Sequence, residues 1–185
     1  KDDSAGLSSL EIIQCIKQFV TWIINKNKYL KKPISIVVGR DGRCSGERIS
    51  TLLIDILLKS GVNVLDLGIT TTPSVQLAII NEKCFGGIMV SASHNPENWN
   101  GLKLLNYSGE FLSNQEGLEV FSIQEFKSIQ NDNTLLRTDY KKKHIQSILR
   151  LKDVNINQIK KQKFKIVVDG INSSGGDSRF ALYSG

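Results

Sequence analysis

The sequence predicts an α/β protein in which helices flank a mixed, largely parallel sheet. Short apolar runs typical of buried strands alternate, in the first half of the chain, with longer segments whose apolar residues recur at helical spacing. Glycine or proline stands at several of the junctions between these segments. A strand-helix-strand-helix-strand order is typical of a parallel sheet covered by helices, because parallel neighbours need a crossover connection.

The first predicted element is an amphipathic helix over residues 8–27. Ser8 and Glu11 have the spacing of a capping box, in which each side chain bonds the other residue's backbone amide. The apolar residues that follow at helical spacing are Leu10, Ile13, Ile16, Phe19, Val20, Ile23 and Ile24. Pro33 then precedes a predicted strand at residues 34–38.

A loop with glycines at both ends, residues 39–46, leads into a second predicted helix. The core-facing residues of this helix are Ile49, Leu52, Leu53, Ile56 and Leu57. Gly61 closes it, and residues 62–67 have the pattern of the next strand. Thr72 and Pro73 start a third helix that runs to about Glu82, since proline is favoured in the first turn.

Two further strands complete the predicted sheet. Residues 86–90 are a continuous apolar run of the buried kind, and residues 102–106 are predicted as an antiparallel neighbour. Lys103 stands between Leu102 and Leu104, so it faces away from whatever those leucines bury. The polar segment between the two strands emerges where the first strand leaves the sheet, a place that often contains functional residues.

A domain boundary is predicted near residue 138. Residues 1–138 then form one domain, and residues 139–185 contain linker helices and the truncated start of a second, similar domain. Residues 128–138 are polar and aperiodic, whereas residues 140–151 and 154–161 have helical patterns and residues 164–168 are of strand type.

Composition excludes several classes of protein. Of the 185 residues 40% are hydrophobic, enough for a full domain core. The net charge of +6 is dispersed over lysines without interleaved aromatics, so we expect solvated helix faces and no nucleic-acid partner. Three cysteines without a Cys-x-x-Cys pair indicate reduced thiols in a cytoplasmic protein. No apolar run approaches a membrane span, so we expect no membrane partner.

The most informative motif is SASHNP at residues 91–96, followed by NGLK at residues 100–103. It brings a serine hydroxyl, an imidazole and an ammonium into one short stretch. A serine hydroxyl is a weak nucleophile at neutral pH and needs a base, a metal or an attached phosphoryl group. The arrangement therefore indicates phosphoryl transfer. The alternative is an ordinary polar turn, since serine, asparagine and proline are the residues that turns prefer.

The loop GRDGRCSG at residues 39–46 is the second candidate for chemistry. Glycines between a strand and a helix let backbone amides approach an anion, and two arginines add positive charge. No Gly-Lys-Ser/Thr closes it, so it is not a P-loop. Arg40 is the candidate phosphate- or substrate-loop residue. The alternative is a tight connection in which Arg40 and Asp41 form a structural pair.

The stretch GGIMVSASHNPENWNGLKLLNYSGEFL, residues 86–112, resembles the active-serine loop of the α-D-phosphohexomutases, the phosphoglucomutase/phosphomannomutase superfamily. VVGRDGRCSGERIS at residues 37–50 and ITTTPSVQLAI at residues 69–79 resemble the same family, in the same order. The resemblance extends over roughly residues 34–176. It implies the first domain of that family and the start of its second.

The resemblance implies an isomerase of carbohydrate metabolism that moves a phosphoryl group between C1 and C6 of a hexose phosphate, through a phosphoserine and a bisphosphate. Ser93 matches the phosphoserine, whose oxygen also binds Mg²⁺, and Lys103 matches the general acid/base. His94 and Asn95 match residues that shape the loop, and a direct proton-transfer role for His94 stays open. Gly101 matches a glycine of the turn before the lysine. A hexose 1,6-bisphosphate is the implied activator.

The chain also departs from the family pattern. Residues from Asp177 onward resemble the tail of the family's metal loop with an acidic position absent. The family's Ser-Gly-x-Arg segment and the loops of its third and fourth domains have no counterpart, so we expect a fragment of a longer mutase. Two alternatives stay open, a phosphoglucosamine mutase of cell-wall amino-sugar synthesis and a non-catalytic phosphosugar-binding fragment. The pattern predicts no oligomeric state.

Overall fold

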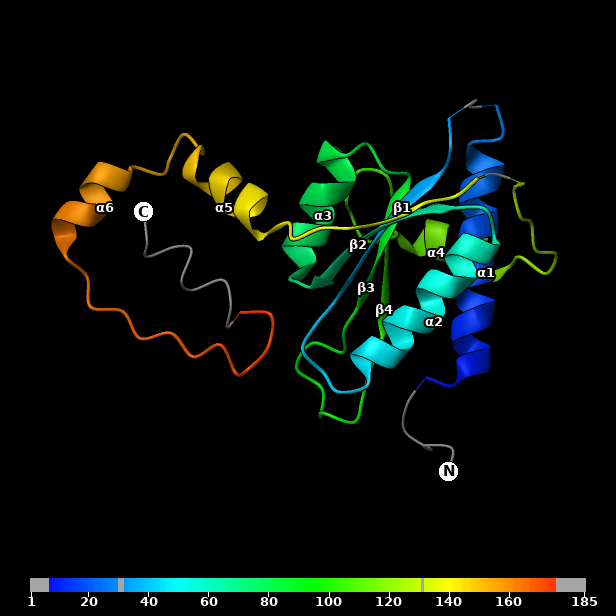
Figure 1. The fold of residues 1–185 in the computed structure, drawn as a ribbon, viewed down its shortest axis with the longest axis horizontal. Coiled ribbons are helices and arrows are strands. Elements are labelled where there is room, and N and C mark those ends of the chain that lie inside the picture. The colour runs from blue at the N-terminus through cyan, green and yellow to red at the C-terminus, as the bar shows by residue number, and fades with distance from the viewer. Residues whose placement is uncertain (1–6, 30–31, 131, 176–185) are drawn as a thin grey trace.

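The computed structural model describes residues 7–29, 32–130 and 132–175. Within them, strands form one mixed sheet in the order β4-β3-β1-β2-β5, with helices on both faces (Figure 1). The predicted α/β fold is therefore confirmed. The strands are β1 Ser35–Arg40, β2 Asn63–Ile69, β3 Gly86–Val90, β4 Leu102–Leu105 and β5 Leu135–Arg137. The helices are α1 Ser9–Lys26, α2 Gly46–Lys59, α3 Thr72–Asn81, α4 Asn114–Phe121, α5 Lys141–Leu149 and α6 Ile156–Gln162.

The pairing of the strands determines which loops meet. β1 lies parallel to both β2 and β3, so the loops that follow β1 and β3 leave the same edge of the sheet. The Asp41 amide donates a hydrogen bond to the Val90 carbonyl at 3.1 Å, which joins the starts of these two loops. β4 runs antiparallel to β3, with Lys103 opposite Met89 near the end of that strand. This edge therefore gathers both candidate motifs and the lysine.

Two apolar layers form the core, one on each face of the sheet. α1, α2 and α4 pack on one face and α3 on the other. Side chains of β1 alternate between the layers, with Ile36 and Val38 in the first and Val37 in the second. β3 is buried along its whole length, as its continuous apolar sequence predicts. A Cβ at Gly86 would lie 2.7 Å from the Leu105 carbonyl oxygen, so glycine is required for the close approach of β4.

The helices begin at the predicted signals. Ser8 Oγ accepts a hydrogen bond from the Glu11 amide at 3.2 Å, and the Glu11 carboxylate accepts one from the Ser8 amide at 2.8 Å. Hydrogen bonds from the Ser8 hydroxyl and amide lower the pKa of Glu11 below its ordinary value. α3 begins after the N-cap Thr71 with Pro73 in its first turn. Both helix starts are confirmed.

Two elements lie where the pattern predicted none. α4 begins with a second capping box, formed by Ser113 and Glu116, and buries Val120 against α1. β5 lies within residues 128–138, which were predicted to be aperiodic, and pairs in parallel with β2 through Leu135 opposite Val64. A strand of three residues is too short to have a recognisable alternation.

The strand predicted at residues 164–168 is wrong. These residues form neither helix nor strand, and Val167 is 99% exposed. A strand persists when its backbone groups pair with those of a neighbour, and no strand pairs with this stretch within the part of the chain that the structure describes. The helices predicted at residues 140–151 and 154–161 are confirmed as α5 and α6, with ends that differ by one or two residues.

α5 contacts the sheet domain mainly through its N-terminal end. Tyr140 is 1% exposed, and its hydroxyl donates a hydrogen bond to the Glu82 carboxylate at 3.0 Å. Lys143 Nζ donates to the same carboxylate oxygen at 2.7 Å. His144 Nδ1 lies 2.7 Å from Ser74 Oγ, a hydrogen bond to α3. α6 buries none of its residues, and Figure 1 shows it extending away from the sheet.

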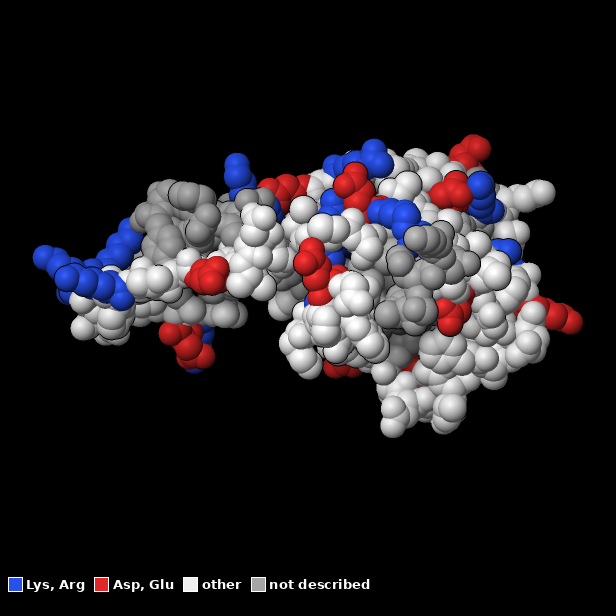
Figure 2. All heavy atoms as spheres, turned by 90° about the horizontal axis from the view of Figure 1, so that it is seen from below, with Lys and Arg blue, Asp and Glu red and all other residues white. Residues whose placement is uncertain are grey.

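Charge is distributed unevenly over the face shown in Figure 2. Lysine and arginine side chains gather at the end formed by α6, whose last turn contains Lys160 and Lys161, whereas both signs of charge mix over the sheet domain (Figure 2). Across the described ranges, none of the helices has the length and apolar character needed to cross a lipid bilayer.

Candidate active site

The serine loop, residues 91–100, follows β3 at the carboxyl edge of the sheet. Lys103 Nζ donates a hydrogen bond to Ser93 Oγ at 2.6 Å. The pairing of β4 with β3 explains this contact. Lys103 is the second residue of β4 and lies opposite Met89, close to the end of β3 where the serine loop begins. The serine and the lysine that the sequence indicated are therefore brought together, at a position where Ser93 is exposed.

The backbone at Ser93 is in the left-handed region, with φ of 55°. Residues other than glycine rarely adopt this conformation, which costs about 1–3 kcal/mol and persists where the surroundings hold it. The Ser93 amide donates to Ser91 Oγ at 3.1 Å, one contact that holds it. The residue with this backbone conformation is the one whose hydroxyl bonds Lys103.

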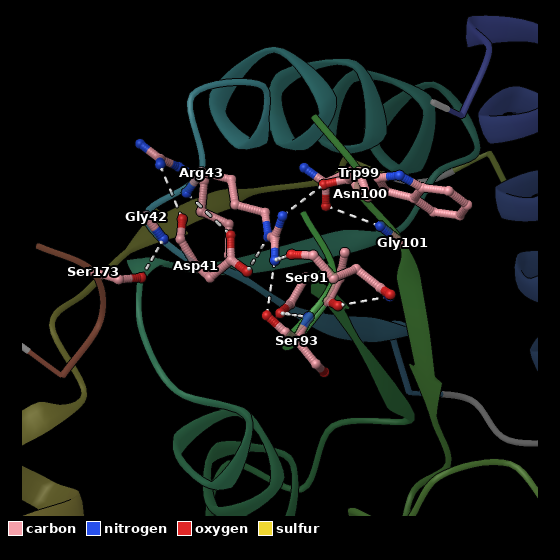
Figure 3. Close-up of polar contacts among 12 residues, drawn as sticks. Asp41, Gly42, Arg43, Ser91, Ser93, Trp99, Asn100, Gly101 and Ser173 are labelled. Carbon is pink, nitrogen blue, oxygen red and sulfur yellow. Dashed lines mark hydrogen bonds and ion pairs between the residues drawn. The ribbon is translucent and has the colours of Figure 1, made fainter. Parts of the chain in front are cut away.

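Arg43 is the central polar contact between the two candidate motifs (Figure 3). Its Nε donates to the Asp41 carboxylate at 3.2 Å, and the two side chains are each 12% exposed. Its two Nη atoms donate to four carbonyl oxygens of the serine loop, those of Ser93 at 2.8 Å, Asn95 at 2.8 Å, Pro96 at 2.5 Å and Trp99 at 3.0 Å. All five guanidinium N–H groups thus have an acceptor.

Asn100 makes a second connection between the same two loops. Its amide nitrogen donates to Ser45 Oγ at 3.0 Å, and its amide oxygen accepts from the Gly101 backbone at 3.0 Å. The Gly101 carbonyl in turn accepts from the Ser91 amide at 2.9 Å. A Cβ at Gly101 would lie 3.1 Å from the Ser91 carbonyl oxygen, which makes any side chain there a tight fit. Gly101 thus permits the close turn that delivers the lysine.

The other predicted site residues lie in the same region with different contacts. Arg40 lies 3.6 Å from Glu47 and donates to the Asp41 carbonyl at 3.4 Å, contacts that do not involve the serine loop. Arg40 and Asp41 thus contact each other through the Asp41 carbonyl, whereas the Asp41 carboxylate bonds Arg43. Asn95 donates to the Ala92 carbonyl at 3.0 Å, within the serine loop. His94 is exposed, and its imidazole makes no hydrogen bond with any described residue.

A magnesium site is not formed by the residues that the structure describes. They contain no group of three or more histidine, cysteine, aspartate or glutamate residues that could hold a metal ion. Ser93 Oγ by itself supplies one oxygen, fewer than the near-octahedral set that Mg²⁺ requires. Asp177, the residue that resembles part of a metal loop, lies outside the described residues.

Sequence reasoning missed the contribution of Arg43, because it selected the first arginine of GRDGR and the structure uses the second to bind the loop. The pattern contained no signal that distinguishes it, since Asp41 stands close to both Arg40 and Arg43 in the sequence and only the structure shows which arginine its carboxylate bonds. A further contact was also missed: the Gly42 amide donates to Ser173 Oγ at 3.0 Å (Figure 3). The segment after α6 therefore returns to the loop that follows β1.

Comparison with known proteins identifies the family. Residues 7–130 match the sequence profile described as "Phosphoglucomutase/phosphomannomutase, alpha/beta/alpha domain I". The chain belongs to the phosphoglucomutase/phosphomannomutase family. Its matched region contains the sheet domain through α4, together with Arg43, Ser93 and Lys103. The family resemblance of the serine loop is therefore confirmed.

Two curated relatives show how much of the family's length is present. The chain is 36% identical over 155 residues to a phosphoglucomutase/phosphomannomutase of Thermococcus kodakarensis, covering 81% of the chain and 33% of that protein. It is 30% identical over 152 residues to a phosphoglucosamine/phosphogalactosamine mutase of Sulfurisphaera tokodaii, covering 80% of the chain and 33% of that protein. The chain thus spans about a third of the curated relatives it matches.

Solved structures show the same fold. Parafusin, a phosphoglucomutase of Paramecium in its open form, superposes with a TM-score of 0.73 at 21% identity, covering 100% of this chain and 41% of that one. A phosphoglucomutase/phosphomannomutase family protein of Burkholderia thailandensis gives a TM-score of 0.64 at 22% identity, covering 77% of this chain and 32% of that one. At these identities the likeness concerns the fold alone.

Proposed function

We propose that this chain is the active-serine domain of a phosphohexomutase, an isomerase that transfers a phosphoryl group between C1 and C6 of a hexose phosphate by way of a phosphoserine at Ser93. The proposal rests on the 2.6 Å hydrogen bond from Lys103 Nζ to Ser93 Oγ. This bond lies at the carboxyl edge of the sheet, in a domain that belongs to this family. A nucleophile with an adjacent proton-transfer group is the arrangement that covalent phosphoryl exchange requires.

Ser93 and Lys103 account for the bonds and protons of the proposed step. When phosphoserine donates its phosphoryl group, the bond between phosphorus and Ser93 Oγ breaks and a bond to a sugar hydroxyl oxygen forms. Lys103 gives a proton to the departing Oγ and recovers one from the sugar hydroxyl that has been phosphorylated. The reverse sequence returns the second phosphoryl group of the bisphosphate to Ser93, by the same path.

The remaining site residues have supporting roles in this proposal. Asn95 and Gly101 shape the serine loop, as their contacts with Ala92 and Ser91 suggest. His94 has no partner that would set it up as a proton donor among the described residues, so we propose that it lines the site. We propose that Arg40, the last residue of β1, binds the phosphate group of the substrate. The implied magnesium would need carboxylates other than those described.

Two sugar assignments follow from the relatives. The Thermococcus kodakarensis protein carries the name phosphoglucomutase/phosphomannomutase, and a relative of Methanococcus aeolicus, 33% identical over 153 residues, is a phosphoglucosamine mutase. We propose a hexose phosphate as the partner, with glucose or mannose phosphate as the first candidates and glucosamine phosphate as the alternative. A cytoplasmic location fits three free thiols, one of them exposed.

The test of the proposal is the Ser93→Ala variant. We expect that the full-length parent incubated with hexose 1,6-bisphosphate and magnesium gains a phosphoryl group at Ser93, and that its Ser93→Ala variant does not, because alanine keeps the backbone and removes the accepting oxygen. Intact-mass measurement with peptide mapping checks this, with circular dichroism as the check on folding. In the full-length parent the same variant should lose mutase turnover.

Ser128→Ala provides the matched control, since Ser128 is exposed and lies outside the serine loop. It should be phosphorylated at Ser93 like the unaltered protein. A phosphoryl group that maps to another residue, or turnover of Ser93→Ala within a few-fold of the unaltered parent, would remove Ser93 from the nucleophile role. A folded protein that binds phosphosugar but never exchanges phosphate would favour the non-catalytic alternative.

A further inference from the structure

Most hydrogen bonds of the Arg43 guanidinium go to one short loop, residues 93–99. Four carbonyl oxygens of residues 93–99 point at a single guanidinium, and the fifth N–H group bonds the Asp41 carboxylate. Converging carbonyl oxygens repel one another, so the loop needs a cation at this point to keep its shape. Because Arg43 is 12% exposed, water does not compete strongly for these bonds.

Arginine is the side chain that suits this position. Its planar guanidinium presents five donors in a fixed fork, and these donors reach acceptors on both sides of the group at once. A lysine ammonium has three donors at one point and carries the same charge, so it cannot bond four carbonyl oxygens and a carboxylate. Asp41, which also accepts from the Arg43 amide at 3.1 Å, fixes the direction in which the fork points.

The link to the nucleophile is direct. The Ser93 carbonyl is one of the four acceptors, and Ser93 is the loop residue with the left-handed backbone. Its amide is held by Ser91 Oγ and its carbonyl by Arg43, so both peptide groups of the strained residue are bonded. The direction of Ser93 Oγ, and hence its 2.6 Å contact with Lys103, depends on these two anchors.

We propose that Arg43 is a positioning residue that clamps the serine loop and holds Ser93 in the conformation that reacts. The catalytic part of this inference rests on the proposed mutase function, whereas the ordering of the loop does not. Among the described residues no hydrogen bond joins Arg43 to Ser93 Oγ or to Lys103, so Arg43 acts through the backbone of residues 93–99.

Hydrogen exchange followed by mass spectrometry tests the clamp without any assay of activity. The informative amides are those of Ser93, Asn95 and Trp99, each of which is hydrogen-bonded within the loop. In Arg43→Lys and Arg43→Ala we expect these amides to exchange at least about tenfold faster, while amides of β1 and β3 keep their rates, since local opening leaves the core intact. Arg48→Lys, an exposed arginine on α2, is the matched control and should change neither set.

The outcomes separate the alternatives. Unchanged exchange in the loop of Arg43→Ala would overturn the clamp. Loss of protection throughout the sheet in both Arg43 variants would also overturn it, because Arg43 would then stabilise the whole domain instead of the loop. Faster exchange in the loop, combined with a full-length parent that never becomes phosphorylated at Ser93, would leave the clamp standing and remove the mutase function.

The catalytic consequence is measured in the full-length parent. Misplacing a nucleophile by about an ångström can cost on the order of 10²-fold in rate, so Arg43→Lys should lower kcat by about that factor and change KM little. Arg48→Lys should match the unaltered enzyme. An equal kcat for Arg43→Lys and the unaltered enzyme, or an effect confined to KM, would show that the clamp does not position the nucleophile.

Discussion

At the scale of single residues, Lys103 can serve Ser93 in two ways, as a proton donor or as a fixed positive charge. The 2.6 Å contact suits both roles, and the two differ in what a substitution would do. Arginine keeps the charge but does not give up a proton near neutral pH, whereas alanine removes both. A comparison of these two variants therefore separates proton transfer from charge stabilisation.

We predict that Lys103→Ala slows phosphoryl transfer by about 10²–10⁴-fold, the range expected for a lost general acid/base, and that Lys103→Arg is nearly as slow. His94→Gln should slow it by less than about tenfold, since no described residue holds the His94 imidazole in place. Single-turnover transfer from phosphorylated full-length parent to a hexose phosphate measures all three. If Lys103→Ala changed KM alone, the lysine would be a binding residue instead.

The candidate site was partly predictable for a physical reason. Ser93 and Lys103 lie ten positions apart in one strand-loop-strand unit, so a local motif contains both. Arg43 and the Ser93 carbonyl lie 50 positions apart, and their contact depends on β1 and β3 being neighbours in the sheet. Local patterns place Arg40 and Arg43 in one loop but do not specify which of them turns toward the neighbouring strand.

At the scale of elements, predictions succeeded where periodicity or a cap was strong. The capping box of α1, the proline of α3 and the apolar run of β3 each predicted an element that the structure confirms. β5 was missed because three residues contain too little pattern, and residues 164–168 were misassigned because strand-type composition does not supply a pairing partner. Long-range pairing, unlike helix formation, is not encoded in a short window.

The contact between α5 and α3 predicts a pH dependence. The hydrogen bond from Lys143, followed by the smaller effect of Tyr140, lowers the pKa of Glu82 below its ordinary value of 4.5, against the opposing effect of partial burial. A carboxyl whose pKa is lowered on folding stabilises the protein above its unfolded pKa and loses that contribution as pH falls through the folded pKa. The contact should therefore weaken in acid below pH 4.5.

Glu82→Gln tests this contact. At neutral pH we expect faster hydrogen exchange in α5 and a lower melting temperature than in the unaltered chain, because Lys143 and Tyr140 lose their charged acceptor. The difference should shrink as pH falls below 4.5, where the native carboxyl also becomes neutral. Glu125→Gln, at an exposed position, is the control. A difference that stays constant with pH would contradict the role of this carboxylate.

At the scale of the whole molecule, the sheet domain has what it needs to fold. Apolar layers cover both faces of the sheet, and the helices that form them lie within the region that matches the family profile. The part after α5 differs, because α6 buries none of its residues and the apolar side chains after it are exposed, among them Phe164, Val167 and Ile171. We therefore expect the first domain to contribute most of the free energy of unfolding. The boundary near residue 138 remains a prediction.

The last prediction is that this 185-residue chain, expressed alone, folds but has no measurable mutase turnover. Transition-state charge in phosphoryl transfer is stabilised by positioned cations, and the described residues do not form a magnesium site. The chain spans about a third of the relatives it matches, so contacts to the non-reacting part of a sugar phosphate, which support turnover as well as affinity, are expected from the rest of such enzymes. A coupled assay with hexose 1-phosphate, a bisphosphate activator and magnesium measures turnover, with the full-length parent as the positive control and circular dichroism to show that the chain is folded. Robust turnover by the chain alone would mean that its own residues complete the site, and the division of labour proposed between this domain and the remainder of the enzyme would be wrong.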